Sequence, residues 1–553
     1  MKKLFFTVVI LISANAFAQK AKDSVPNNWH QLDQASTGYY GISLDKAYAF
    51  VKDKKLKSKQ VIVAVIDSGI DTLHEDLKPI LWTNPKEIPG NGIDDDKNGY
   101  VDDIHGWNFI GGKDGRNVKE DSHEAARVYN DLKVKYGSEI PDETALQPAQ
   151  KMEVEMYKKA KQEIVGGVDQ AEISLLKQLL PGFIKGDSVI MKELAKDEYD
   201  CNDLEKYTSA NADAKRTKGF LLQLCKGNSS NEVTNKQIIS ELNSELAKAD
   251  AADNAPKPYR KEIVQDDETD INDRFYGNSD LMAATPFHGT HCAGIIAAVR
   301  DNNTGVNGIA DNVRIMMIRA VPDGDEHDKD IANAIRYAVD NGAQVVSMSF
   351  GKGISPEKKW VDDAVKYAES KGVLLVHAAG NDAKNVDRTD NFPSPVYLDN
   401  GKKANNWITV GASGDPKNGG ITASFSNYGK QQVDVFAPGV QIYSSVPGGN
   451  KYGHASGTSM ACPVVAGTAA FLLEYYPKLS AKQLKYIIEK SAVDPGIDVN
   501  IPGTKEKTKL SELSVSGGLL NAYEAIKLAA TLTGERKQTE VLPKPTMVKN
   551  KQG

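Results

Sequence analysis

The stretch VIVAVID at residues 61–67 decides the fold of this 553-residue chain. It is a continuous apolar run rich in β-branched residues, which is typical of a strand buried on both faces of a parallel sheet. Similar runs recur along the chain: VRIMMIRAV (313–321), AQVVSMSF (343–350), GVLLVHAAG (372–380) and WITVGA (407–412).

Amphipathic helical patterns lie between these runs, as in KDIANAIRYAVDNG (329–342) and PEKKWVDDAVKYAESKG (356–372). Each of the two ends at a glycine, which is a common helix C-cap. The alternation predicts an α/β fold with a doubly wound, mostly parallel sheet that is covered by helices on both faces. In such sheets, functional sites form at the carboxyl ends of the strands.

The alternation breaks between residues 115 and 275, where the chain is rich in Lys, Glu and Ala and poor in strand patterns. AQKMEVEMYKKAKQEIV (149–165) and NKQIISELNSELAKAD (235–250) have the spacing of amphipathic helices. We therefore expect a mainly helical subdomain inserted into the α/β domain.

The N-terminus, MKKLFFTVVILISANAFAQ, has two lysines, a short apolar run and the small-x-small site Ala16-Phe17-Ala18. This pattern predicts a secretory signal peptide cleaved near Ala18, and therefore a secreted or periplasmic protein. A transmembrane anchor is less favoured because the run is short for a bilayer, and no other stretch is long enough to span one. The net charge of −6 argues against nucleic acid and anionic membranes as partners.

The predicted division of the chain is a signal peptide at 1–18, an N-terminal segment at 19–40, the α/β domain at 41–114 and 276–533, the insertion at 115–275 and a polar tail at 534–553. Export permits disulfides among the four cysteines, for which sequence alone allows three pairings. Cys201 and Cys225 share the insertion, whereas Cys292 and Cys462 begin apolar helices and are equally well explained as buried thiols.

Three glycine-flanked turns carry the residue types of nucleophilic catalysis. Asp67 ends the first strand in VIDSGID, His288 opens HGTHCAGIIAAV, and Ser459 lies in GTSMACP before a long apolar run. A nucleophilic serine needs a base to take its proton, and the base needs a carboxylate that orients it. Each residue alone is also explained as a turn, core or helix-capping residue, so the prediction depends on the three together.

A serine near a helix N-terminus lies where backbone N–H groups and the helix dipole favour negative charge. A second oxyanion donor is available from Asn381 in AAGN, which follows the strand at 372–380. Gly457 is expected to permit a tight turn, and Gly289 the close approach of a neighbouring segment.

The segments VIDSGID, HGTHCAGI, AAGN and SGTSMACPVVAG, in this order, resemble the signature segments of the subtilisin-like serine proteases, the subtilases of peptidase family S8. The resemblance covers about 42–110 and 280–530. It implies a subtilisin-like three-layer α/β/α fold and a serine endopeptidase that acts on peptide or protein substrates through an acyl-enzyme.

The resemblance also implies a role at each matching position. Asp67 orients the histidine, His288 is the general base and then the acid, and Ser459 is the nucleophile. Asn381 and the Ser459 backbone N–H form the oxyanion hole. The implied substrate-binding residues are Ser349, Phe350 and Gly351, which pair with the peptide as an added strand, and Ala378, Ala379 and Gly380, which line an open pocket for the residue before the cut. His291 is expected to be structural, and His377 and His454 are expected to have packing or rim roles.

A second motif, NGIDDDKNGYVDDIHGWNF (91–109), clusters carboxylates around Asn98-Gly99. It is similar to the first half of an EF-hand loop, although His105 takes the place of the final Glu. The candidate calcium ligands are Asp94, Asp96, Asn98, Tyr100 through its carbonyl, Asp102 and Asp103. A solvated acidic turn is the alternative, but close carboxylates repel one another unless a cation offsets them. A structural calcium is therefore favoured, with no catalytic cofactor.

The chain departs from the family in the spacing of its motifs, because 288 − 67 = 221 residues separate Asp67 from His288. Both ends of the insertion should lie near the active-site face, where it caps the cleft or acts as a dimerisation or docking arm. Residues 19–40 leave little room for a folded inhibitory prodomain.

Three rival functions fit less well. A serine-carboxyl peptidase of related fold would have Glu in place of His288. A catalytically silent binding protein that uses the insertion would have lost a member of the triad. A calcium-dependent structural protein would leave the three glycine turns unexplained.

Overall fold

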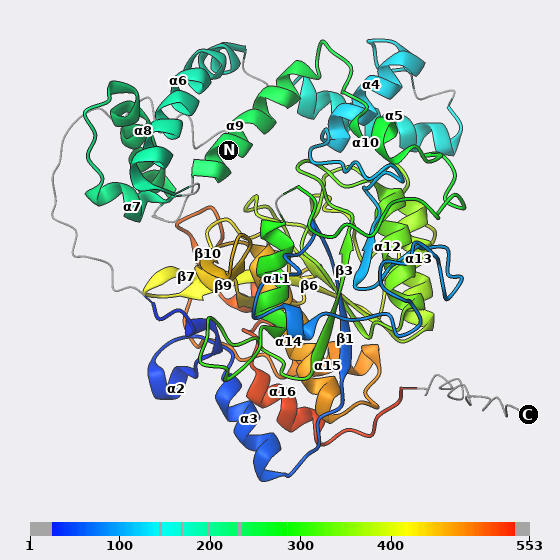
Figure 1. Ribbon diagram of the computed structural model, residues 1–553, viewed down its shortest axis with the longest axis vertical. Coiled ribbons are helices and arrows are strands. Elements are labelled where there is room, and N and C mark those ends of the chain that lie inside the picture. The colour runs from blue at the N-terminus through cyan, green and yellow to red at the C-terminus, as the bar shows by residue number, and fades with distance from the viewer. Residues whose placement is uncertain are drawn as a thin grey trace, which may run out of the picture.

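The computed structural model describes residues 25–142, 146–166, 170–196, 199–228, 235–284 and 286–536. Its main sheet has the order β2-β3-β1-β4-β5-β6-β7, and β8 also pairs with β6 (Figure 1). The strands are β1 (Val61–Asp67), β2 (Gly106–Asn108), β3 (Val313–Arg319), β4 (Val345–Met348), β5 (Leu374–Ala378), β6 (Trp407–Asp415), β7 (Asn418–Thr422) and β8 (Val435–Pro438). Only β7 runs antiparallel to its neighbour in this sheet, so the prediction of a mostly parallel sheet is confirmed.

Strand β1 lies at the centre, with β3 on one side and β4 on the other. Its side chains alternate between the two faces: Val63 and Val65 join one hydrophobic layer, and Ala64 and Ile66 join the other. Because both faces of the sheet are covered, side chains on either face are buried and can be apolar. This explains the uninterrupted apolar run. The chain passes from β1 to β2 and β3 on one side of it, and then from β3 to β4 on the other side. Open α/β sheets form their sites at such a reversal of strand order.

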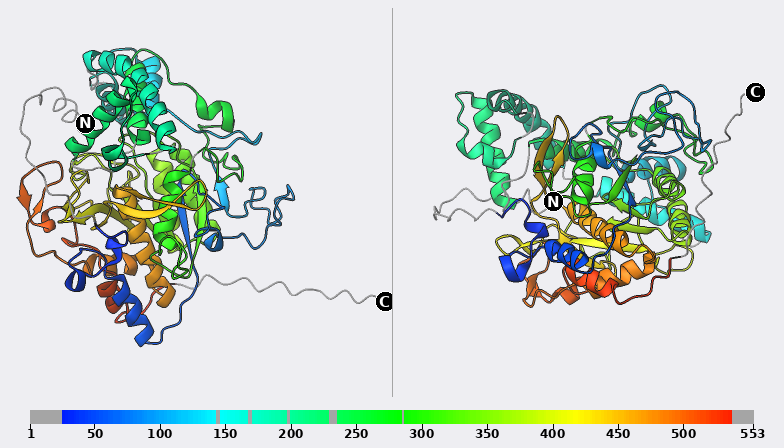
Figure 2. Two further views of the ribbon diagram at one scale, coloured as in Figure 1. Left: turned by 60° about the vertical axis from the view of Figure 1, so that its left-hand side comes forward. Right: turned by 60° about the horizontal axis from the view of Figure 1, so that its bottom comes forward.

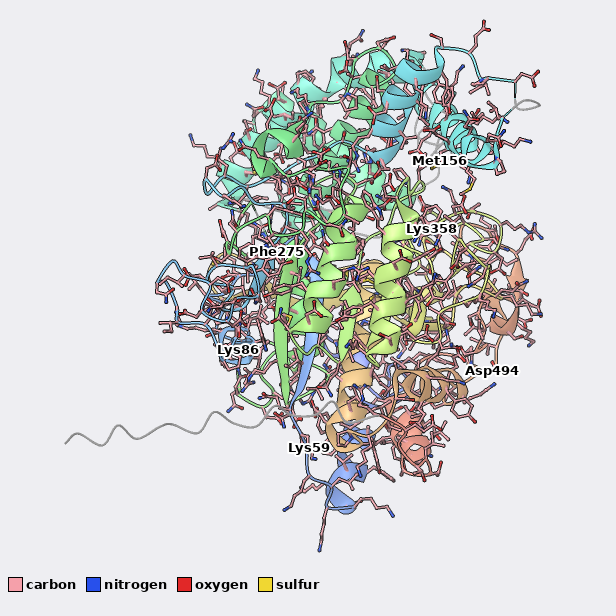
Figure 3. The ribbon with its side chains drawn as sticks, turned by 90° about the vertical axis from the view of Figure 1, so that its right-hand side faces the viewer. Lys59, Lys86, Met156, Phe275, Lys358 and Asp494 are labelled. Carbon is pink, nitrogen blue, oxygen red and sulfur yellow. A yellow bond between two sulfur atoms is a disulfide. The ribbon has the colours of Figure 1, made fainter. Side chains whose placement is uncertain are left out.

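Helices cover both faces of the sheet in the predicted three layers. On one face pack α3 (Leu44–Asp53), α11 (Phe287–Ala297), α14 (Thr458–Tyr475), α15 (Ala481–Lys490) and α16 (Ala522–Ala529). On the other pack α12 (Asp328–Asp340) and α13 (Lys358–Ser370), which stand side by side in Figure 3. Smaller elements complete the α/β domain: η1 (Trp29–Gln31), α2 (Gln34–Thr37), η2 (Lys78–Ile80), the pair β9 (Ile442–Val446) and β10 (Lys451–Ala455), the pair β11 (Val499–Asn500) and β12 (Lys507–Thr508), and η4 (Leu510–Glu512).

The helices of the insertion form two separate hydrophobic clusters, although the sequence suggested one subdomain. Helices α4 (Glu124–Tyr136) and α5 (Pro148–Ile164) share one cluster, which also includes Ile354 of the α/β domain. The second cluster joins α6 (Gln170–Leu194), α7 (Cys201–Lys206), α8 (Ala212–Asn228) and α9 (Asn235–Asp250). We call these the α4–α5 lobe and the α6–α9 lobe; α10 (Tyr259–Val264) leads back to the α/β domain.

Both lobes lie at one end of the molecule, beyond the same edge of the sheet (Figures 1 and 2). In Figure 1 the α6–α9 lobe lies on the side of β9 and β10, and the α4–α5 lobe lies above α12 and α13. Within the α6–α9 lobe a disulfide joins Cys201 of α7 to Cys225 of α8, while Cys292 and Cys462 are buried free thiols.

The predicted signal peptide at 1–18 and most of the predicted polar tail lie outside the described residues. Among the residues that are described, none of the helices has both the length and the apolar character needed to cross a bilayer.

Helix α14 carries a buried acid, Glu474, at the end opposite Ser459. Glu474 has no solvent-exposed surface, and its Oε1 accepts a hydrogen bond from the backbone N–H of Asn312 at 3.0 Å. Burial, and then the neighbouring Asp311, raise the pKa of Glu474 to about 9. The folded protein therefore holds a proton at neutral pH that the unfolded chain, with an ordinary Glu pKa, releases.

This buried acid should make folding stability depend on pH. A raised folded-state pKa gives Glu474 its full stabilising effect below pH ~4.5, and the effect is lost as pH rises through about 9. Over that interval the free energy of unfolding should fall by about 1.4 kcal/mol for each unit of rising pH, because the folded state holds one more proton than the unfolded chain. In Glu474→Gln this slope should disappear, as measured by urea unfolding at several pH values between 5 and 9. Parallel pH dependence in the two proteins would contradict the assignment.

Candidate active site

The candidate site forms where three neighbouring strands end. β1 ends at Asp67, the chain after β4 continues to Ser349, and the chain after β5 continues to Asn381. Helix α11 begins at Phe287 and α14 at Thr458, so His288 and Ser459 both lie in a first helical turn. The sheet thus brings together residues that are up to 459 − 67 = 392 positions apart in the sequence.

Asp67 and His288 are joined by a two-oxygen hydrogen bond. The Nδ1 of His288 lies 2.8 and 2.9 Å from the two carboxylate oxygens of Asp67. The Asp67 side chain is 2% exposed, whereas that of His288 is 36% exposed. Because a carboxylate only accepts, Nδ1 carries the proton, and Nε2 is left free to act as a base.

Gly289 allows this pair to form. A Cβ at Gly289 would lie 2.1 Å from the carbonyl oxygen of Gly69 and 3.1 Å from the Cβ of Asp67. Any side chain there would push α11 away from the end of β1, which supports the close approach expected from the sequence.

The charge of Asp67 controls the proton affinity of His288. Burial alone lowers the pKa of His288, but the opposite charge and the hydrogen bond of Asp67 outweigh it and raise the pKa well above 6.5. Since Asp67 is almost fully buried, water screens its charge weakly. The pair therefore stabilises the imidazolium that forms when a histidine takes a proton from a nucleophile.

Ser459 is the second residue of α14, and its Oγ donates to the backbone carbonyl of Ser349 at 3.2 Å. Pro463, four residues later, has no N–H to bond the Ser459 carbonyl. That carbonyl instead accepts from the Ser349 hydroxyl at 2.9 Å and from the Cys292 thiol at 3.4 Å. The proline therefore frees a helix carbonyl that holds the Ser459 backbone against its neighbours.

The described hydrogen bonds of Ser459 Oγ do not include one to His288. Catalytic hydrogen bonds are often long or misaligned until substrate binds, so this arrangement is compatible with a resting nucleophile.

Asn381 caps α14 from a distant strand end. Its Oδ1 accepts from the backbone N–H of Thr458 at 2.9 Å and from the Thr458 hydroxyl at 3.0 Å. The helix cap is thus neither Ser459 nor Gly457 but an asparagine 77 positions earlier than Thr458. Because Oδ1 is engaged by the helix, the exposed Asn381 side chain keeps its amide N–H groups for another acceptor.

The loop that carries Asn381 is fixed by a residue that sequence reasoning missed. Asn427 Nδ2 donates to the Ala379 carbonyl at 2.8 Å, and its Oδ1 accepts from the N–H groups of Asp382 and Lys384. Gly380 has φ of +98°, and a Cβ there would lie 2.4 Å from Asn427 Nδ2. No local pattern around Asn427 signals this role, because these three partners of its side chain are more than 40 residues away.

Gly457 differs from expectation. Its φ of 160° is close to extended backbone, and an added Cβ would lie 3.5 Å from Asn381 Nδ2, an ordinary contact. The turn before Ser459 therefore does not depend on a left-handed glycine.

The model of the subtilase family matches residues 58–523. This chain belongs to the subtilase family.

Similar proteins include a thermophilic serine proteinase from Bacillus sp. (strain AK1), 40% identical over 259 residues, which are 46% of this chain and 55% of that protein. Subtilisin DY of Bacillus licheniformis is 40% identical over 38% of this chain and 71% of its own length. Thermitase of Thermoactinomyces vulgaris is 35% identical over 48% of this chain and 85% of its own length. The chain thus spans about half of the length of the proteinase from strain AK1. Its subtilase domain is a domain of the serine-type endopeptidase class.

In this subtilase, the segment after β4 presents alternate backbone groups to two sides. The Phe350 carbonyl accepts from Nε2 of His377 at 2.7 Å, and burial lowers the pKa of His377 to about 4, so this imidazole is neutral. The Ser349 carbonyl, one residue earlier, accepts from Ser459 Oγ instead. Two successive carbonyls of this segment are therefore held by different elements, β5 and α14.

The predicted pocket wall is largely buried. Ala378 and Ala379 are 3% and 0% exposed and pack into hydrophobic clusters, and only Gly380 of the three is partly exposed. The expectation that small side chains at 378–380 line an open pocket therefore applies to Gly380 and not to the two alanines.

The remaining histidines near the motifs have packing contacts. His291 is fully buried, its Nε2 lies 3.1 Å from the Gly453 carbonyl, and burial lowers its pKa to about 3. His454 packs against the Tyr443 ring, and burial lowers its pKa as well.

The acidic loop at 91–109 brings together only part of the predicted set. Carboxylate oxygens of Glu87, Asp94 and Asp96 lie within 4.8 Å of one another, and Glu87 was not among the predicted ligands. Asp102 instead accepts from the N–H groups of Gly90 and Gly92, both at 2.8 Å. The other predicted ligands lie beside the cluster: Asn98 donates to Asp103 at 3.0 Å, Asp103 also accepts from the Tyr337 hydroxyl at 2.6 Å, and the Tyr100 ring packs against Trp107.

The charge of Asp67 should set the acid limb of activity. Only neutral His288 can accept a proton, so kcat/KM should rise with pH through a midpoint above 6.5. Asp67→Asn removes the charge that stabilises the imidazolium, so the midpoint should fall, and kcat should drop about 10⁴-fold. The measurement is the pH profile of kcat/KM for a chromogenic peptide, with the exposed Asp53→Asn as control. An unshifted limb in Asp67→Asn would refute this role.

Proposed function

We propose that this chain is an exported serine endopeptidase that hydrolyses peptide bonds through an acyl-enzyme on Ser459. The observation that carries the proposal is the buried, two-oxygen contact of Asp67 with His288 Nδ1, at the same sheet edge as the first turn of α14. A buried carboxylate that fixes one tautomer of a partly exposed histidine is the arrangement needed for general-base catalysis.

In the proposed mechanism, Nε2 of His288 takes the proton of Ser459 Oγ as the oxygen attacks the carbonyl carbon before the scissile bond. The Ser459 N–H and the Asn381 amide then stabilise the oxyanion, and each such donor contributes roughly 3–4 kcal/mol. His288 passes the proton to the leaving amine, which departs. Water, deprotonated by His288, releases the acid product and restores Ser459.

The hydrogen bond from Ser459 Oγ to the Ser349 carbonyl suggests how substrate binding could activate the serine. A peptide that pairs with the segment at 349–351 as an added strand would compete for the Ser349 carbonyl. Ser459 Oγ would then be released toward His288.

Covalent labelling tests the nucleophile. A fluorophosphonate probe should modify wild-type protein at Ser459, as located by peptide mapping. Ser459→Ala and His288→Ala should abolish labelling, because one lacks the oxygen and the other the base. Ser36→Ala, at an exposed serine, is the matched control and should label normally. Folded wild-type protein that resists labelling would favour the silent binding protein over the peptidase.

The proposal includes export. The pattern of residues 1–18 supports a cleaved signal peptide, and the disulfide between Cys201 and Cys225 fits an oxidising compartment.

We also propose that the acidic loop binds a structural calcium ion, chiefly through Glu87, Asp94 and Asp96. Beyond the clustering of the carboxylates, Glu87 is 7% exposed, and its Oε2 has no hydrogen-bond partner among the described residues. A buried unpaired carboxylate oxygen next to two other carboxylates is unfavourable unless a cation binds there. The Lys86 ammonium group that pairs with Asp96 lies 3.7 Å from it and is 68% exposed, so it offsets little of this charge. Oxygen-only donors suit Ca²⁺.

Calcium removal should therefore destabilise the protein. Chelation should lower the Tm of the wild type by about 2–3 °C, since a ligand at 100 times its Kd stabilises by about 2.7 kcal/mol and a chain of this length has an unfolding entropy of about 1 kcal/mol per K. Glu87→Gln should have a lower Tm that no longer responds to calcium. Asp95→Asn, in the same loop but outside the cluster, should keep the wild-type response. Equal responses of the Glu87 and Asp95 variants would contradict the site.

A further inference from the structure

A buried lysine follows directly on the segment proposed to bind the peptide. Lys352 comes after Gly351, and its side chain is 1% exposed. Its Nζ lies 2.6 Å from Glu124 Oε2, 2.9 Å from Asp328 Oδ1 and 2.7 Å from the Glu326 carbonyl. A buried ammonium group is stable only when anions and acceptors surround it, so these contacts fix where the Lys352 backbone can lie.

Glu124 belongs to the insertion and is the first residue of α4. It is 6% exposed, and it also pairs with Arg127 at 2.7 Å. Arg127 in turn donates to the carbonyls of Asp325 and Glu326, so it binds the loop that also contributes an acceptor to Lys352. The first turn of the insertion therefore completes an ion-pair network that the α/β domain only half supplies.

Apolar packing joins the same two segments independently of charge. Ile354, two residues beyond Lys352, is 3% exposed and belongs to the cluster formed by α4 and α5, together with Tyr129 and Tyr157. Lys159 of α5 also pairs with Asp390, close to Phe392, whose backbone bonds both ways to the backbone of Lys352. The α4–α5 lobe thus contacts both chain segments of this small bridge.

The network is connected to the nucleophile through few residues. Three positions before Lys352, the Ser349 carbonyl accepts from Ser459 Oγ, and the Ser349 hydroxyl binds the Ser459 carbonyl. Between Ser349 and Lys352, the Phe350 carbonyl accepts a hydrogen bond from His377 of β5. The segment 349–351 is therefore held at one end by α14, in its middle by β5, and at its other end by the insertion.

We propose that Glu124 and Lys352 are positioning residues for the peptide on the acyl side of the scissile bond. They act by holding the segment 349–351 in the extended form with which that peptide pairs. The insertion is then a working part of the substrate site and not a detachable cap. This inference rests on the proposed peptidase function, because it assigns a role to the segment at 349–351 in peptide binding.

Asp328 alone does not suffice for this role, because its carboxylate is shared. Its Oδ2 accepts from the Ser355 hydroxyl at 2.9 Å and from the Glu357 N–H at 2.8 Å, where it caps the approach to α13. Loss of the Glu124 charge would leave the buried Lys352 ammonium group with the Asp328 carboxylate, which Ser355 and the Glu357 N–H also share. The backbone at 351–352 would then relax toward water to hydrate the ammonium group.

The test compares substrates of different length in Glu124→Gln and Lys352→Met. Chromogenic amides with one or four residues before the scissile bond differ only in the part that reaches the segment 349–351. We expect KM for the four-residue amide to rise about tenfold, with little change for the one-residue amide or for the rate of fluorophosphonate labelling. The double variant should resemble either single variant in KM, because the two residues act as one unit.

Two controls separate positioning from folding. Glu153→Gln breaks the pair of Glu153 with Lys135 inside the same lobe, at 2.7 Å, without touching the network, and should leave both KM values unchanged. Lys352→Met replaces a buried charge by an apolar side chain of similar length, so its Tm shows whether lost activity follows lost stability. If all substrates and the labelling rate decline together with Tm, the pair is only a structural anchor and the proposal fails.

Binding without catalysis distinguishes this proposal from the peptidase function. In a Ser459→Ala background, calorimetry measures the Kd of a four-residue peptide acid with and without Glu124→Gln. A weaker Kd by about tenfold supports the positioning role even if labelling of the wild type fails. An unchanged Kd overturns the role, whatever the chemistry at Ser459.

Discussion

The contact on which the rest of the site depends is that of a buried carboxylate with one nitrogen of a histidine. Asp67 lies at the end of the central strand, out of reach of water, and His288 meets it with Nδ1. Burial makes the charge of Asp67 strong enough to raise the pKa of His288, and it also fixes the orientation of the ring. The contact requires α11 to lie against the end of β1 at Gly289, where no side chain would fit. The close packing of this helix is therefore a condition for the hydrogen bond between Asp67 and His288.

The first turn of α14 combines catalytic and structural constraints. Asn381 caps the helix with its oxygen and leaves its N–H groups for the oxyanion of the proposed mechanism, while Pro463 frees the Ser459 carbonyl to bind Ser349 and Cys292. Single residues thus serve stability and chemistry together. Substitutions here are expected to affect both. The insertion extends the same principle, because the charge of Glu124 completes the surroundings of a lysine next to the segment 349–351.

Much of this molecule follows from local sequence. The apolar run at 61–67 and its repeats predict a parallel sheet, and the glycine turns around Asp67, His288 and Ser459 place three reactive residues at element ends. These predictions succeed because strand periodicity and turn chemistry are local properties, and because parallel strands all end at one edge. The resemblance of the four motifs to the subtilases then gives each residue an expected role, and the subtilase family model covers residues 58–523.

The sequence by itself determined the layers, the strand ends and the chemical types that meet there. Only the tertiary structure decided which distant residues complete each group: Asn427 beneath the Asn381 loop, Glu87 beside Asp94 and Asp96, Cys201 with Cys225, and Glu124 on Lys352. In the tertiary structure the insertion also forms two lobes, and Ala378 and Ala379 are buried in the core. The reason is physical: these outcomes depend on how buried charges and unpaired polar groups find partners across the fold, and such partners lie at no fixed spacing along the chain.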